Sequence, residues 1–216
     1  MLYWQYKGLL SRLIFTYNSM KFDKSFDIET TQKLDRTELD VSTQKKAHAS
    51  SYHALDVGRF KRVMKSIPVD FTTYCFIDIG SGKGRVLFMA DQLRFCRIIG
   101  VEFSQILHKI AEQNLKNYLN KLNKTRSEAC IELFNCDALD FQFPAEPAII
   151  FLFNPFDEIV MANFVKNLRQ SIEISPRDIF LVYVHPTAEN VFRESGYLHK
   201  ILEDRKKDDY VIYKAG

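Results

Sequence analysis

The sequence predicts an α/β fold with a mostly parallel sheet. Short apolar runs alternate with helical stretches of about ten residues or more, which is typical of βαβ units. Glycines at alternate positions follow the first of these runs, at the edge where an open parallel sheet binds its ligands. The alternation ends near the C-terminus, where two strand-like segments flank a short polar turn and predict an antiparallel hairpin.

The periodicity of apolar residues places the elements along the chain. A helix is expected to begin near Tyr52 and to end at Pro68. The parallel strands are expected at 74–79, 97–102, 131–135, 148–153 and 179–184, and the hairpin strands at 197–203 and 209–214. Further helices are expected at 84–94, 104–121 and 157–173. Ser104 and Asp157 each follow a strand-exit turn, where a side-chain oxygen can cap the helix that begins there.

The N-terminal part of the chain differs in composition from the rest. Residues 1–17 are apolar and aromatic at helical spacing, but they are too short and too charged to span a bilayer. We expect an amphipathic helix docked on the domain, with binding to a membrane surface or a partner as the alternative. Residues 21–50 are polar and predict a loop or a flexible lid. The expected division is an N-terminal helix and polar lid segment, residues 1–50, and one domain, residues 51–216.

Charge and cysteine content limit the classes of partner. The net charge is +3 and no dense stripe of Lys and Arg is present, so nucleic acid is a less favoured partner. The strongest basic cluster, Arg205–Lys207, is followed by two aspartates and predicts a charged hairpin tip. The four cysteines lack C-x-x-C spacing and lie mostly in apolar sequence. They predict buried, reduced thiols in a cytoplasmic protein and no metal site.

The most specific motif is Phe-Ile-Asp-Ile-Gly-Ser-Gly-Lys-Gly-Arg at residues 76–85. A dinucleotide-binding turn requires G-x-G-x-x-G, and Arg85 stands where the third small residue would be. That argues against a nicotinamide or flavin cofactor. Asp78 before the glycines suits a ligand with a cationic amino-acid tail, and a carboxylate that stabilises the turn is the alternative. The small residues expected beside the ligand are Gly80, Ser81, Gly82 and Gly84.

This motif resembles the first motif of class I S-adenosylmethionine-dependent methyltransferases. Residues from about 50 to 186 also resemble bacterial members of that class in Ile-Gly-Val-Glu-Phe-Ser, Phe-Asn-Pro-Phe-Asp-Glu and Val-Tyr-Val-His-Pro. The resemblance implies S-adenosyl-L-methionine as cofactor and a Rossmann-like, seven-stranded sheet with helices on both faces. The glycine motif and Gly-Val-Glu also look like those of non-SET histone-lysine methyltransferases and mitochondrial lysine methyltransferases, which suggests a protein lysine as acceptor.

Carboxylates also follow the next two expected strands. Glu102 can accept hydrogen bonds from both hydroxyls of a ribose, although an acidic residue at this place is also usual in NAD proteins. Phe103 would lie on the adenine face or in the core. The segment Asn-Cys-Asp-Ala-Leu resembles the acidic turn of the family, which implies that Asp137 and the backbone N–H of Ala138 bind the adenine. A helix-capping aspartate is the alternative for Asp137.

Three further residues are candidates for the acceptor side, and one for a cover. Asn154-Pro155-Phe156 is similar to, but shorter than, the Asn/Asp-Pro-Pro-Tyr/Phe loop of amino-group methyltransferases. The similarity implies that Asn154 holds a nitrogen nucleophile and Phe156 packs over the substrate, with a structural turn as the alternative. His185 ends a strand and can accept a proton, or it is a structural histidine. Tyr52 is expected to close over the cofactor.

These residues favour a methyltransferase that acts on an amine nitrogen of a protein or small molecule. Two alternatives remain open from the sequence. One is a dinucleotide-binding oxidoreductase, supported by Glu102 and opposed by Arg85. The other is a catalytically silent module that binds S-adenosylmethionine, because no indispensable base is identifiable.

Overall fold

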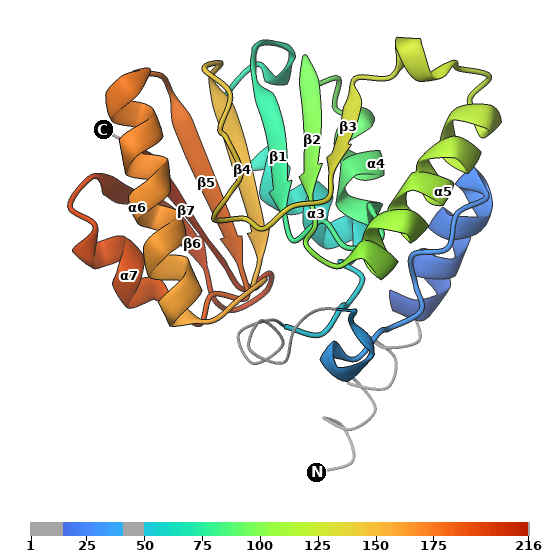
Figure 1. Cartoon of the computed structure of the whole chain (residues 1–216), viewed down its shortest axis with the longest axis horizontal. Helices are drawn as coiled ribbons and strands as arrows, with labels where there is room; N and C mark the ends of the chain where they lie inside the picture. The colour runs from blue at the N-terminus through green and yellow to red at the C-terminus, as the bar shows by residue number, and fades with distance from the viewer. Residues whose placement is uncertain (1–14, 41–49, 216) are drawn as a thin grey trace.

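A seven-stranded sheet forms the centre of the computed structural model, which describes residues 15–40 and 50–215 (Figure 1). The strand order is β3-β2-β1-β4-β5-β7-β6, with β1 to β5 parallel and β7 antiparallel between β5 and β6. The strands are β1 Cys75–Ile79, β2 Arg97–Val101, β3 Ile131–Phe134, β4 Ala148–Phe153, β5 Ile179–Val184, β6 Leu198–Asp204 and β7 Tyr210–Ala215. The predicted α/β fold with its C-terminal hairpin is confirmed.

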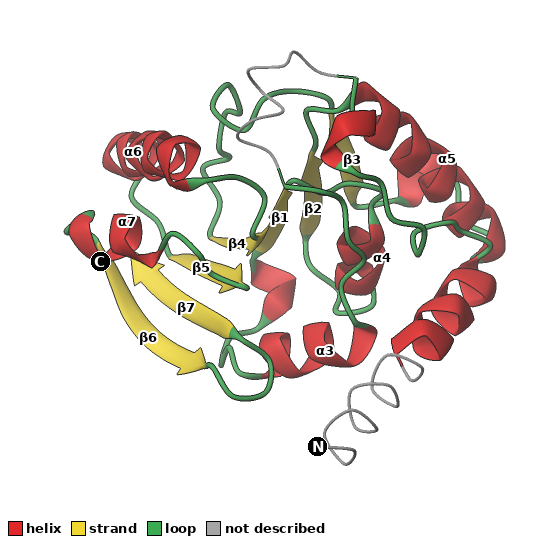
Figure 2. Cartoon of the chain, turned by 90° about the horizontal axis from the view of Figure 1, so that it is seen from below, coloured by secondary structure: helices red, strands yellow, loops and turns green. Residues whose placement is uncertain are grey.

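Helices cover both faces of this sheet (Figure 2). The α-helices are α3 Val57–Lys65, α4 Arg85–Asp91, α5 Gln105–Lys121, α6 Glu158–Ile174 and α7 Glu189–Glu194, and the 3-10 helices are η1 Arg36–Glu38, η2 Phe71–Thr73 and η3 Arg126–Glu128. The predicted caps are confirmed, since Ser104 accepts from the backbone of Leu107 and Asp157 from that of Val160. The short helix α7 was not predicted, because six residues carry too little periodicity.

Alternate side chains of the parallel strands enter two separate cores. Phe76 and Phe151 pack with Phe60 against α3 and α4, while Ile77 and Ile150 face α6. The buried strands β4 and β5 are continuous apolar runs, as is typical of a parallel sheet, and β1 is interrupted by Asp78. This arrangement fixes the carboxyl ends of the strands at one edge, where the glycine turn lies.

The N-terminal segment is more ordered than its composition predicts. Residues 15–26 are helical, so the expected loop is wrong for residues 21–26. Phe22 and Phe26 pack together, and Phe26 lies 5.0 Å from the ring of Tyr118 on α5, beside which this helix runs in Figure 1. The amphipathic helix expected at residues 1–17 falls, for residues 1–14, outside the described part of the chain.

The basic cluster and the cysteines were also assigned places from the sequence. The basic cluster does occupy the turn between β6 and β7. All four cysteines are free, but only Cys75 is buried; Cys96 and Cys130 are exposed because they lie at the ends of strands rather than inside them. Among residues 15–40 and 50–215, no helix is long and apolar enough to cross a membrane.

Candidate functional site

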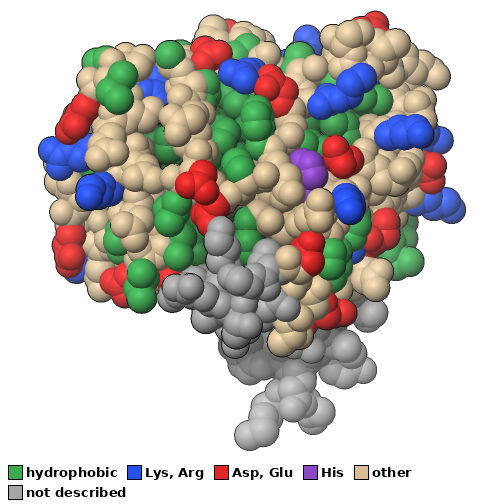
Figure 3. Space-filling model, viewed as in Figure 1, with side chains coloured by type: hydrophobic (Ala, Val, Ile, Leu, Met, Phe, Trp, Pro, Cys, Tyr) green, Lys and Arg blue, Asp and Glu red, His purple; other side chains and the backbone are tan. Residues whose placement is uncertain are grey.

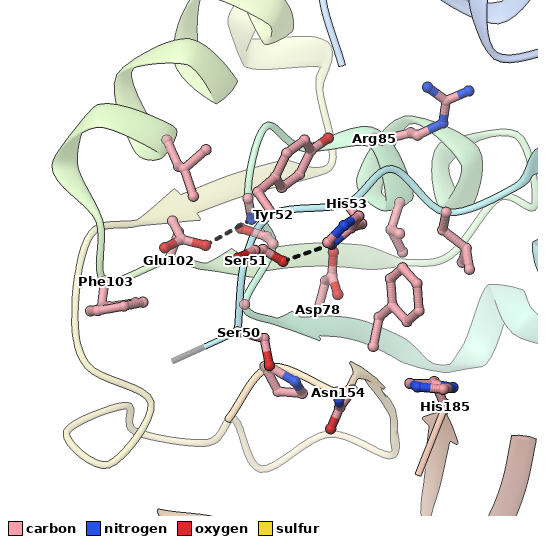
Figure 4. Close-up of a pocket in the computed structure, with 18 of the residues that line it drawn as sticks. Ser50, Ser51, Tyr52, His53, Asp78, Arg85, Glu102, Phe103, Asn154 and His185 are labelled. Carbon is pink, nitrogen blue, oxygen red and sulfur yellow. Dashed lines mark hydrogen bonds between the residues drawn. The ribbon is translucent and has the colours of Figure 1, made fainter. Parts of the chain in front are cut away.

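A cavity of about 660 Å³ lies at the carboxyl ends of the parallel strands (Figure 4). The turns after β1, β2 and β4, the residue after β5 and the segment before α3 contribute its lining. Of the predicted site residues, the lining includes Tyr52, Asp78, Gly80, Ser81, Gly82, Glu102, Phe103, Asn154 and His185. The fold therefore brings together residues that the sequence spreads over more than half of the chain.

The glycine turn is tight because protein side chains cover it. Gly82 has a φ of 54°, and a Cβ added there would lie 2.4 Å from the ring of Tyr52. Gly80 has a φ of 78°, and its Cβ would lie 2.8 Å from Cβ of Pro155. Glycine is thus required by left-handed backbone and by close neighbours within the chain. The Tyr52 hydroxyl donates to the Thr30 carbonyl at 2.7 Å, which holds the ring over the turn.

Asp78 is a buried carboxylate that points into the cavity (Figure 4). It is 2% exposed, and no hydrogen bond to it is found within the described residues. The turn is stabilised by other acceptors, because Gly80 and Ser81 donate to the Val101 carbonyl and Gly82 donates to Glu102. Burial, and then the charge of Glu102, raises the pKa of Asp78 well above its usual range. Asp78 therefore does not stabilise the turn through a hydrogen bond, which was the alternative role for this residue.

Glu102 joins the turns after β1 and β2. Its Oε2 accepts from the Gly82 N–H at 2.8 Å and its Oε1 from the Ser104 N–H at 2.9 Å. Burial raises its pKa to about 7, although these backbone donors favour the charged form. Glu102 and Asp78 thus form a pair of buried carboxyl groups on one side of the cavity, beside Phe103.

Four predicted residues do not line the cavity: Gly84, Asp137, Ala138 and Phe156. Gly84 is the N-cap of α4. Asp137 Oδ1 accepts from the backbone of Leu139 at 3.0 Å, in a turn that no helix follows, so Asp137 does not cap a helix. Ala138 and Phe156 pack on the core under α6, with the Phe156 ring 5.8 Å from that of Phe164. The ligand roles of these four residues stay predictions.

The Asn154 turn already uses the oxygens expected to hold an amine. Asn154 Oδ1 accepts from the Thr187 hydroxyl at 2.8 Å and from the Tyr183 hydroxyl at 3.3 Å. The Pro155 carbonyl accepts from the Ser50 N–H at 3.2 Å. An incoming amine would share or displace these donors.

Arg85 and Asp209 are residues whose contacts the sequence did not reveal. Arg85 is 2% exposed, and its Nη1 donates to the Thr30 hydroxyl at 2.8 Å and lies 3.2 Å from Asp23 Oδ1. It therefore anchors the N-terminal segment that carries the partner of Tyr52. Asp209 lies 2.7 Å from Nδ1 of His185, although 24 residues separate them. The predicted hairpin was the one signal for this pair.

Comparison with known proteins identifies the class of fold. Over 148 residues the chain is 29% identical to a histone-lysine N-methyltransferase, H3 lysine-79 specific, of Dictyostelium discoideum; the match covers 66% of this chain. The chain spans only 7% of the length of that relative. No protein-family model matches the chain.

Solved structures agree on the fold. A predicted N6-adenine-specific DNA methylase from Listeria monocytogenes has a TM-score of 0.56 at 12% identity, covering 76% of this chain and 51% of that one. A dimethyladenosine transferase from Plasmodium falciparum has a TM-score of 0.50 at 14% identity, covering 73% and 60%. The fold is that of class I methyltransferases, and the resemblance to a histone-lysine methyltransferase expected from the glycine and Gly-Val-Glu motifs is confirmed.

Proposed function

We propose that the protein is an S-adenosylmethionine-dependent methyltransferase. The observation that carries the proposal is the convergence of Asp78 and Glu102, from adjacent strand ends, on one cavity beside a glycine turn. The similarity to a histone-lysine methyltransferase, whose match covers 66% of this chain, supports it.

The cavity residues fit this cofactor in charge and size. A buried carboxylate without a hydrogen-bond donor is unfavourable, and the cationic amino group of the cofactor would supply both a donor and a positive charge to Asp78. Glu102 would accept from the ribose hydroxyls, and the exposed edge of Phe103 would contact the base. The cavity volume lies within the range of about 300–1,000 Å³ that is usual for small-molecule sites. When bound, the cofactor supplies a methyl group on an activated sulfonium, so positioning of the acceptor contributes most of the rate.

The proposed acceptor is an amine nitrogen of a protein or of a small molecule. The named substrate of the curated relative, a histone lysine, supports an amine. If Asn154 and the Pro155 carbonyl hold that nitrogen, the amine shares or displaces the donors that these oxygens already accept from, Thr187 and Ser50. On the face shown in Figure 3, basic side chains are scattered among acidic and apolar ones, which does not favour nucleic acid. A cytoplasmic location is part of the same proposal.

Two assays on the full chain test this proposal. Isothermal titration with S-adenosylmethionine and with S-adenosylhomocysteine should give micromolar binding of both. Cofactor with a labelled methyl group is then incubated with cell lysate, and protein, nucleic acid and small molecules are separated. Label in protein or amine metabolites would support the acceptor class. Binding without transfer to any fraction would identify a silent module, and folded protein without binding heat would refute the proposal.

A further inference from the structure

Strained backbone gathers on the acceptor side of the cavity. Asn154, His185 and Asp209 have φ values of 42°, 53° and 45°, in the left-handed region that non-glycine residues seldom adopt. Asn154 and His185 line the cavity, and Asp209 contacts His185 from the turn between β6 and β7. Strain of this kind persists where surrounding contacts impose it, and it is frequent at functional sites.

Asp209 is fixed from several sides. Its Oδ2 lies 2.7 Å from His185 Nδ1, and its Oδ1 accepts from Arg205 Nη1 at 3.3 Å. Its backbone carbonyl accepts from the His185 N–H at 2.8 Å and from Arg59 Nη2 at 3.0 Å. Burial alone would raise the pKa of Asp209, but the hydrogen bonds from His185 and Arg205 and the positive charge of Arg59 lower it below the usual value. An ionised carboxylate can only accept, so the imidazole proton resides on Nδ1.

The other ring nitrogen of His185 is then left as an acceptor. No partner for Nε2 is found in the described part of the chain, and Figure 4 places the ring at the rim of the cavity next to the Asn154 turn. The charged groups that contact the carboxylate partner of this ring, Asp209, are Arg59 and Arg205.

We propose that Asp209 is a positioning residue that holds His185 with Nε2 free to take a proton from the methyl acceptor. This rests on the proposed methyltransferase function. The nucleophilic atom of the acceptor forms a bond to the methyl carbon, and the carbon–sulfur bond breaks with its electron pair going to sulfur. A thioether leaves, and the proton of the acceptor passes to Nε2 and from there to solvent. A lysine ammonium needs such a step, because it has no lone pair until it loses a proton.

A purely structural role for the pair is weaker on the same geometry. The β5–β7 ladder pairs Val184 with Tyr210, and the backbone bond from His185 to Asp209 already continues it. The His185 side chain is 61% exposed, and ion pairs at such exposure contribute little to stability. The side-chain pair is therefore not required to close the sheet.

The test compares Asp209→Asn with Asp204→Asn, a matched change in the same hairpin that does not contact His185. In Asp209→Asn, Arg205 continues to donate to the side-chain oxygen, so the amide N–H₂ group faces the His185 ring. Nδ1 then accepts from this amide, and the imidazole proton moves to Nε2. Nitrogen-15 NMR of the histidine rings should show Nδ1–H in the wild type and Nε2–H in Asp209→Asn. Transfer of labelled methyl groups to lysate acceptors should fall by roughly 10²–10⁴-fold, the scale of general base catalysis, with unchanged cofactor affinity.

His185→Gln should lose transfer to the same degree, whereas His199→Gln, a change at an exposed strand position, should not. The proposal is overturned if the wild-type ring carries its proton on Nε2, or if Asp209→Asn transfers methyl groups at the wild-type rate. It is also overturned if Asp204→Asn loses as much transfer as Asp209→Asn. Failure of the wild type to bind the cofactor would instead contradict the proposed function itself.

Discussion

Replacement of Glu102 by Gln should flatten the dependence of stability on pH. Folding raises the pKa of Glu102 from 4.5 to about 7, because burial disfavours its charged form. Above pH 4.5 the unfolded chain ionises this group while the folded chain keeps it protonated, so stability falls as pH rises to about 7. A rise from 4.5 to about 7 corresponds to about 3 kcal/mol of unfolding free energy.

The assay is urea unfolding followed by circular dichroism between pH 4.5 and 8. The wild type should lose about 3 kcal/mol more stability than Glu102→Gln over this range. The variant also loses one of the backbone bonds from Gly82 and Ser104, but that loss is the same at every pH. Glu158→Gln, at an exposed position on α6, is the control and should keep the wild-type slope. Parallel curves for Glu102→Gln and the wild type would refute the reasoning.

Three further changes test the site. Gly82→Ala should destabilise the fold and weaken cofactor binding, because the added Cβ would lie 2.4 Å from an aromatic ring. The control Gly196→Ala, with a φ of 74° and open space around it, should affect stability alone. Unfolding and ligand titration measure the two effects, and equal binding defects in both variants would contradict a role of Gly82 in the cofactor site. Asp78→Asn should raise the stability of the free protein at neutral pH, because Asp78 is a buried carboxyl group. The same change should reduce the affinity for S-adenosylmethionine at least about tenfold in a titration, because a charge-assisted hydrogen bond is lost. Unchanged affinity would mean that the amino group of the cofactor does not bind Asp78. Arg85→Met should release the N-terminal segment and speed its proteolysis, because Arg85 contacts Asp23. In a double-mutant cycle with Asp23→Asn, the changes in unfolding free energy should be coupled; additive changes would show that this contact does not anchor the segment.

The sequence predicted those parts of the cavity that depend on a local motif or on the regular arrangement of parallel strands. Asp78 lies near the end of β1 and Glu102 directly follows β2, and adjacent parallel strands bring their carboxyl ends to one edge, so their convergence needed no further information. Asp137 also follows a strand, but its side chain accepts from the backbone of its own turn. A strand position fixes where a residue lies, whereas competition from nearby N–H groups decides where its side chain points.

The remaining features depend on tertiary contacts. The His185–Asp209 pair requires the antiparallel register of β5 and β7 and two residues in the left-handed region. The helical residues 15–26 span the boundary between the apolar residues 1–17 and the polar residues 21–50, and Phe26 packs on Tyr118 of α5, a contact that the sequence does not show. Arg85 could be read only as a departure from a glycine motif, because its partners lie more than fifty residues earlier.

A crystal structure of the full chain with S-adenosylhomocysteine would test the central claim most directly. The account predicts the ligand in the cavity at the strand ends, with its amino group within hydrogen-bond distance of Asp78 and its ribose hydroxyls at Glu102. Density for the ligand in another cavity, or with its amino group away from both carboxylates, would contradict the account.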